Sequence, residues 1–226
     1  MMESDNIPMS YTIFRLFCFS GMGLIVLGIV YSALRYRGKR GEKYSILNHF
    51  ISELGEVGVT PSAWAFNLSL TLGGLITLPY IVGLGIKFDS LLGWLGMAAG
   101  LAATLGVAAV GLFPMNKMDA HIKASLTYFR AGLVMVLFFG LAILFQPAGI
   151  KFVPKIANLL SLLAFGVYAS FLMMLKPRKP AGGNTGTNSL DPAEKPERPR
   201  VWLFPLMEWM VFFATLLWLF GMAFFI

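Results

Sequence analysis

The two histidines of the chain lie close to carboxylates and are the side chains best suited to chemistry. His49 is followed by Ser52 and Glu53 at positions i+3 and i+4, so on a helix the three side chains would share one face. The second imidazole, His121, comes shortly after Asp119. A neutral imidazole can bind a metal beside a carboxylate or act as a general base. We therefore take His49, Ser52, Glu53 and His121 as candidate catalytic residues, and both histidines as candidate metal ligands.

A structural role explains the same residues. The Ser-x-x-Glu pattern is typical of helix capping, which could employ Ser52 and Glu53. His121 stands where a helix is expected to begin, so capping at the membrane surface competes with metal binding. The spacings match no established catalytic motif, and the sequence identifies no cofactor.

Three polar residues stand within or at the edge of long apolar runs, namely Asn67, Arg130 and Glu208. A charge inside a membrane is costly and normally faces the interior of a helix bundle, where it has a partner. Arg130 and Glu208 are expected to approach from the same membrane surface, where they could pair, either as a structural ion pair or as a site for a headgroup or a proton. The three residues are therefore candidate ligand-binding residues.

The elements that must position these residues are transmembrane helices. The chain is 57% hydrophobic and 13% charged, whereas soluble proteins carry about 25% charged residues. Its apolar residues form six runs long enough to cross about 30 Å of hydrocarbon. The runs cover 11–34, 62–86, 91–113, 122–145, 152–175 and 202–225. The sequence predicts an all-α polytopic membrane protein, a six-helix bundle that forms one domain over residues 1–226.

Two of the connections are long. Residues 36–61 begin with basic residues and become amphipathic, so we expect a short interfacial helix at 45–54. Residues 177–200 are rich in Pro, Gly, Asn and charged residues, a composition typical of a disordered loop. Lys and Arg are concentrated in the first, third and fifth connections, which predicts that these face the cytoplasm and that both termini lie outside the cell membrane of a prokaryote.

The expected partners are membrane lipids. The basic residues that give the net charge of +7 lie beside apolar runs and have no interleaved aromatic residues, which argues against a nucleic-acid partner. Gly96 and Gly100 form a face of small residues, which allows close packing inside the bundle, in a homo-oligomer or in a larger membrane complex.

Several short motifs resemble those of a known family. They are the segment from Ser45 to Gly55 with Ile-Ser-Glu-Leu-Gly at its end, then Pro61, Phe66-Asn67, the Gly-Leu-Phe-Pro that ends at Pro114, and His121. Together they resemble prokaryotic six-helix membrane proteins grouped as domain of unknown function 998, and more distantly the DRAM and Sfk-type membrane proteins. The resemblance implies six spans and points to Ser52, Glu53, Gly55, Pro61, Asn67, Pro114 and His121, but implies no reaction.

Our leading hypothesis is a polar pocket facing the cytoplasm that binds a lipid headgroup or a small amphiphile. Its expected lining is His49, Ser52, Glu53, Asn67, His121, Arg130 and Glu208, with Arg130 holding an anionic group. One alternative is a membrane-embedded, lipid-modifying hydrolase that uses a histidine with Glu53, with or without a metal. The other is a structural subunit of a larger membrane complex.

Overall fold

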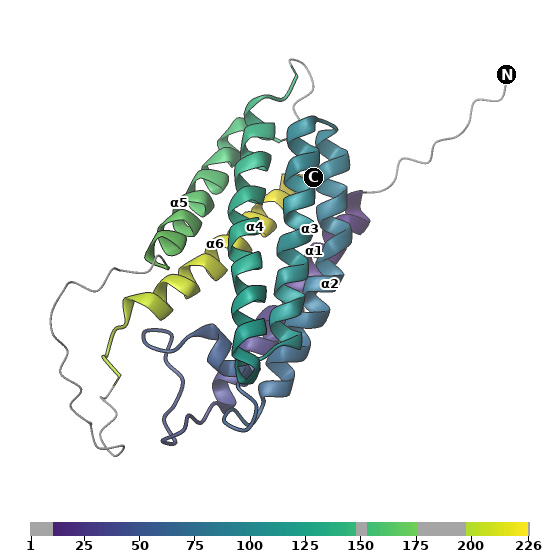
Figure 1. Ribbon diagram of the computed structural model, residues 1–226. Helices are drawn as coiled ribbons and strands as arrows, with labels where there is room; N and C mark the ends of the chain where they lie inside the picture. Colours follow the sequence, from purple (N-terminus) through teal and green to yellow (C-terminus); the bar gives the residue numbers. More distant parts are fainter. Residues whose placement is uncertain (1–10, 148–152, 176–197, 226) are drawn as a thin grey trace, which may run out of the picture.

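The computed structural model of the protein describes residues 11–147, 153–175 and 198–225. Six helices in this part of the chain are long and apolar enough to cross a membrane (Figure 1). They are α1 (Tyr11–Arg35), α2 (Ala63–Phe88), α3 (Leu91–Leu112), α4 (Met118–Leu144), α5 (Asn158–Met174) and α6 (Leu203–Phe225). The predicted fold class is confirmed, and the protein is a multi-pass membrane protein.

Apolar runs of this length become helices because a helix satisfies its backbone hydrogen bonds internally, which lipid cannot do. The runs end where the chain can turn. Between α2 and α3 the break takes two residues: Asp89 adopts a left-handed conformation with φ of 34°, and the Ser90 hydroxyl accepts a hydrogen bond from the backbone N–H of Gly93 at 3.1 Å. This turn makes α2 and α3 a tight helical hairpin.

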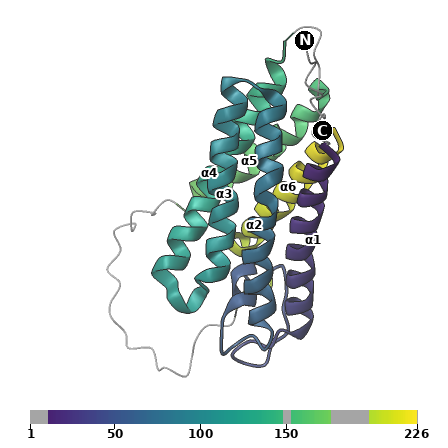
Figure 2. The same ribbon diagram turned by 90° about the vertical axis from the view of Figure 1, so that its right-hand side faces the viewer.

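The helices form a ring in chain order. Each helix packs on the next, and α6 returns to contact α1. In Figures 1 and 2, α2, α3 and α4 run side by side, whereas α6 lies at a slant to them. Large side chains that are fully buried in this arrangement include Tyr80, Tyr168 and Trp218.

Glycines allow α2 and α3 to approach closely. A Cβ atom on Gly74 would lie 2.8 Å from the carbonyl oxygen of Thr104, closer than van der Waals contact permits. The small-residue face of α3 is used in the same way, since Gly96 packs on Phe139 and Gly100 packs on Ile81. That face therefore packs within the bundle.

One end of the bundle, which we name the loop end, carries the connection between α1 and α2. This connection contains a turn at 45–49 and the short 3₁₀ helix η1 (Ile51–Gly55). The prediction of one interfacial helix over 45–54 is therefore wrong, because a turn and a short 3₁₀ helix stand in its place. The backbone N–H of Phe50 donates to the Glu53 side chain and that of Ile51 donates to Glu208, so neither is free for an α-helical bond.

Candidate functional site

Glu53 is the centre of a buried polar cluster at the loop end. Its side chain is 6% exposed and forms two parallel bonds with Arg198, from Nη1 to Oε1 and from Nη2 to Oε2, each at 2.8 Å. The Tyr36 hydroxyl donates to Oε2 at 3.3 Å, and the backbone N–H of Phe50 donates to Oε1 at 3.0 Å. A carboxylate has about four acceptor positions, so Glu53 is fully used by the protein itself.

The charges of this cluster reinforce one another. Hydrogen bonding to Glu53 raises the pKa of Arg198, which keeps the guanidinium charged. Burial and then the charge of Glu53 raise the pKa of Tyr36, so this phenol stays neutral and remains a donor.

His49 packs against the same cluster. Its side chain is buried, its Nδ1 lies 3.2 Å from the Ser45 carbonyl oxygen, and its ring centroid lies 5.3 Å from that of Tyr36 and 5.2 Å from that of Tyr44. Burial lowers the pKa of His49, which favours the neutral imidazole. Its Nε2 is buried and has no hydrogen-bond partner among the described residues. We name this group the polar cap: Tyr36, Tyr44, His49, Glu53 and Arg198.

The segment that leads into α6 is hydrogen-bonded to the turn at 45–49, next to the polar cap. The side chain of Asn48 donates to the carbonyl oxygen of Pro199 at 3.1 Å, and the backbone N–H of Trp202 donates to the carbonyl oxygen of Leu47 at 2.8 Å. Most of the loop predicted to be disordered, 177–200, lies outside the described residues. Its last three residues are described, and they include Arg198.

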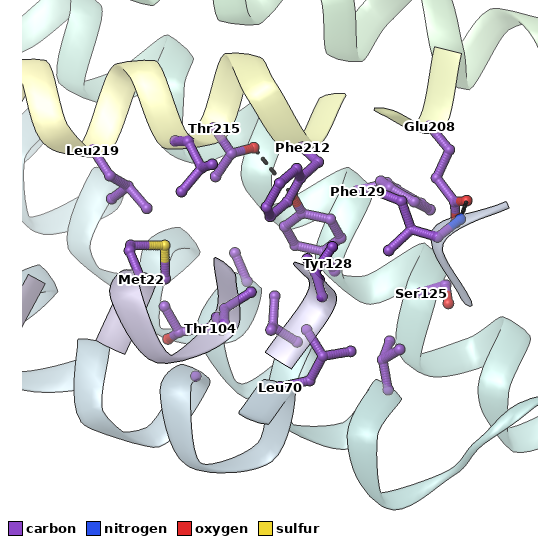
Figure 3. A pocket seen from close by; sticks show the side chains of 18 of the residues that line it. Met22, Leu70, Thr104, Ser125, Tyr128, Phe129, Glu208, Phe212, Thr215 and Leu219 are labelled. Carbon is purple, nitrogen blue, oxygen red and sulfur yellow. Dashed lines mark hydrogen bonds between the residues drawn. The ribbon is translucent and has the colours of Figure 1, made fainter. Parts of the chain in front are cut away.

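Glu208 lines a cavity within the helix ring (Figure 3). The empty space between its atoms is about 930 Å³, a volume that includes open solvent, and about 100 Å³ of it is free for the centres of water-sized molecules. All six helices contribute apolar side chains to its lining, among them Ile25, Leu70, Val107, Phe129, Tyr168 and Phe212. Of the described residues that line it, Glu208 is the one with a carboxyl group.

The hydroxyl groups in the middle of the cavity satisfy one another. Thr215 Oγ1 lies 3.0 Å from the Tyr128 hydroxyl and 2.7 Å from the Tyr168 hydroxyl, and it donates to the carbonyl oxygen of Val211 at 2.8 Å. Thr104 donates to carbonyl oxygens of its own helix. These groups leave little capacity for a ligand.

The polar groups at the loop end of the cavity are less fully used. Glu208 Oε2 accepts one bond, from the backbone N–H of Ile51 at 2.8 Å, and no other from the described residues. The hydroxyls of Ser52 and Ser125 line the same cavity and form no hydrogen bond with the described part of the chain. Figure 3 shows Ser125 and Glu208 at one end, near Phe129. This end can therefore accept a polar group from a ligand.

The structure divides the predicted site residues among several places. Ser52 and Glu208 line the cavity, whereas His49 and Glu53 belong to the polar cap. The side chain of Asn67 donates to the carbonyl oxygen of Gly55 at 3.0 Å, which fastens η1 to α2. His49, Ser52 and Glu53 do not share a face, because the chain is not α-helical between them.

The expected pair between Arg130 and Glu208 does not form within the described structure. Arg130 is exposed on the outside of α4, and Glu208 instead accepts the backbone bond from Ile51. The buried carboxylate that does pair with an arginine is Glu53, and its partner is Arg198.

The histidines do not assemble a metal site from the described residues. His121 is buried at the start of α4, with Nδ1 2.8 Å from the carbonyl oxygen of Phe113, and His49 lies in the polar cap. Within 11–147, 153–175 and 198–225, no three or more His, Cys, Asp or Glu side chains are grouped so that they could hold a metal ion. A protein zinc site normally needs three or four such ligands.

Sequence reasoning missed Ser125, Tyr128 and Thr215. A signal for them was present: Ser125 and Tyr128 are spaced i, i+3, and Thr215 follows Glu208 by two helical turns, so each pair shares a helix face. Arg198 gave no such signal, because it stands in a polar connection of low complexity.

No curated protein and no solved structure matches the chain. A family described as "Protein of unknown function (DUF998)" matches residues 19–187, which is more than half of the chain and includes η1 and the first five helices from within α1 onward. The match ends before Arg198 and α6. The chain therefore belongs to the DUF998 family.

Proposed function

We propose that the protein binds a single-chain amphiphile in the cavity, with a headgroup that donates hydrogen bonds to Glu208. The observation that carries this proposal is the set of three polar side chains with unused hydrogen-bonding capacity, Ser52, Ser125 and Glu208, at one end of an otherwise apolar cavity. The rest of the lining is mostly apolar and comes from all six helices, which suits the hydrocarbon chain of such a molecule.

The charge of the lining favours an amine headgroup. In its ionised form Glu208 attracts a cation and repels an anion, and the ring of Phe129 beside it suits an ammonium group. This changes the expected headgroup class, because the anionic group was assigned to Arg130, which is exposed on the outside of the bundle.

The hydrolase alternative has less support. That alternative uses a histidine with Glu53, but both oxygens of Glu53 are bonded to Arg198 and to other groups of the polar cap. The Ser52 hydroxyl also forms no hydrogen bond with either histidine in the described structure. A role as a structural subunit would leave the cavity without a ligand, and it is an outcome of the test below.

The test is equilibrium binding of radiolabelled hexadecylamine, hexadecanol and hexadecanoate to the full chain in nanodiscs of zwitterionic lipid, with protein-free nanodiscs subtracted. We expect saturable binding of the amine, about tenfold or more tighter than that of the carboxylate. Glu208→Gln should remove most of this preference, because the amide still accepts the bond from Ile51 but carries no charge.

The matched control is Glu56→Gln, which removes a carboxylate at the loop end that pairs with Lys39 outside the cavity. This variant should bind all three probes like the wild type. Absence of saturable binding, or equal binding of the three probes in both the wild type and Glu208→Gln, would overturn the proposal and favour the structural role.

A further inference from the structure

We propose that a bilayer amphiphile reaches the cavity sideways through a groove between α1 and α6, which its hydrocarbon chain occupies during entry and exit. The inference rests on the proposed function, because it supplies the path by which the cavity is filled. It arises from a separate observation, the way in which α1 and α6 close the helix ring.

The two helices touch at the end of the bundle away from the loop end. There the Cys18 thiol lies 3.8 Å from the carbonyl oxygen of Leu219, and the ring centroid of Phe19 lies 5.5 Å from that of Phe220 and 6.0 Å from that of Phe224. In Figure 2, α6 meets α1 near the C-terminus and leans away from it toward the loop end. The helices therefore form a wedge that opens toward the loop end.

A groove of about 870 Å³, a volume that again includes open solvent, fills this wedge. Its outer walls carry apolar side chains that are about half exposed, Val30 on α1 and Phe213 on α6. At its loop end stand Tyr44 and Trp209, which satisfy each other through a bond of 3.2 Å from the indole N–H to the phenol oxygen. No described residue that lines the groove carries a charge, so it suits a hydrocarbon chain and not a headgroup.

The groove and the cavity share a wall. Ile29, Phe212 and Leu216 line both spaces, so the two are separated by the width of these residues. Phe212 and Leu216 are one helical turn apart on α6, and both are half-buried. Side chains can change rotamer without moving a helix, so a chain in the groove has a short path to the cavity.

The two interfaces of α2 and the loop end are more tightly closed. The interfaces of α2 with α1 and with α3 are closed by glycines in direct contact with the neighbouring helix, such as Gly28 against Ser69 and Gly74 against Thr104. At the loop end, η1 is held in place by the two parallel bonds between Glu53 and Arg198. Access from the bilayer between α1 and α6 therefore requires a smaller rearrangement than access along α2 or past η1.

The test measures how fast hexadecylamine binds and dissociates in nanodiscs, together with its affinity at equilibrium. Val30→Trp places a large ring in the groove at a position that does not line the cavity. It should slow both association and dissociation by about tenfold and leave the affinity within about twofold. Leu27→Trp is the matched control, because Leu27 is an exposed residue of α1 outside the groove.

A second variant has the opposite expected effect. Phe213→Ala widens the groove and should accelerate association and dissociation, whereas Leu217→Ala, at an exposed position of α6 outside the groove, should change neither. Rates that stay at the wild-type value in both Val30→Trp and Phe213→Ala, while the amine still binds, would overturn the lateral path alone. Absence of any saturable binding in the wild type would instead overturn the proposed function.

Discussion

The polar cap and the loop end of the cavity meet at η1, yet they use their polar groups in different ways. Glu53 faces the cap and accepts four hydrogen bonds from the protein, two of them from Arg198. Glu208 faces the cavity and accepts one, while Ser52 beside it accepts and donates none among the described residues. Buried polar groups are costly when unpaired. The difference separates a region that holds the chain together from a region that has capacity for a ligand.

The Ile-Ser-Glu-Leu-Gly motif serves both regions at once. Ser52 lines the cavity and Glu53 belongs to the cap, although the two residues are adjacent in the sequence. At the end of the motif, Gly55 lies so close to Asn67 and Phe66 that a Cβ atom would overlap them. The motif therefore contributes residues to two regions, the cavity and the polar cap.

The largest expected effect separates the cap from an ordinary surface ion pair. Glu53→Gln leaves Arg198 without its counter-charge, and we expect a loss of about 2–4 kcal/mol in the free energy of unfolding, below the 3–5 kcal/mol of fully buried pairs. The reduction reflects the partial exposure of Arg198, whose side chain is 38% exposed. Chemical denaturation of the full chain in detergent micelles measures it.

The matched control is Glu56→Gln, which breaks the pair with Lys39, a lysine that is 69% exposed. This pair should contribute less than about 1 kcal/mol. Equal losses in the two variants would mean that the polar cap does not hold the loop end in place.

The second prediction concerns the polar groups of the cavity that are already satisfied. Thr215→Val keeps the shape of the side chain but removes the oxygen that the Tyr128 and Tyr168 hydroxyls contact. We expect a loss of about 1–3 kcal/mol, because buried hydroxyls lose a partner. Thr127→Val is the control, since Thr127 is exposed on α4 and bonds only to its own helix. A loss in Thr215→Val no larger than in the control would show that the cavity is wet enough to replace these bonds.

The third prediction is that Glu208, unlike Glu53, matters for binding and not for stability. Glu208→Gln should change the free energy of unfolding by less than about 1 kcal/mol, because the amide oxygen still accepts the bond from Ile51. The same variant should lose most of its preference for the amine over the carboxylate, whereas Glu53→Gln should keep that preference in the fraction that stays folded. If Glu208→Gln instead destabilises the protein as much as Glu53→Gln does, the carboxylate of Glu208 is a structural group like that of Glu53.

The fold follows from the sequence because lipid imposes a strong rule: a long apolar run must form a helix. The predicted runs therefore fall on the six helices, with ends that differ by a few residues, as at 122–145 against Met118–Leu144. The same rule also singled out Glu208 as a functional candidate, because a charge inside such a run is costly. Ser52 was a candidate through its spacing from His49, although the two do not share a face.

The pairing of charges could not be read in the same way. The position of Arg130 along α4 indicates its depth in the bundle but not the side of the helix that faces inward, and the neighbouring Phe129 takes the buried side. Arg198 and Glu53 are 145 residues apart, so no local spacing connects them. Contacts between distant segments depend on how the helices pack, which a single sequence does not show.

The smallest expected effect is a dependence of stability on pH that arises in the polar cap. Burial lowers the pKa of His49, while the charge of Glu53 acts in the opposite direction and limits the shift. The unfolded chain has the ordinary histidine pKa of about 6.5, so it takes up a proton before the folded chain does as the pH falls. The stability contributed by the neutral ring is therefore fully present above pH of about 6.5 and is lost as the pH falls from there through the lower pKa of the folded state.

Denaturation in micelles between pH of about 8 and 5 tests this, because histidine is the side chain whose ordinary pKa lies in that window. The wild type should lose stability toward the acidic end, and His49→Phe should flatten part of that loss, since the phenyl ring keeps the contacts with Tyr36 and Tyr44 but cannot be protonated. An unchanged slope in His49→Phe would contradict the prediction, and it would mean that the unpartnered Nε2 of His49 reaches water. In that case the polar cap would resemble the loop end of the cavity, because it too would have unused hydrogen-bonding capacity.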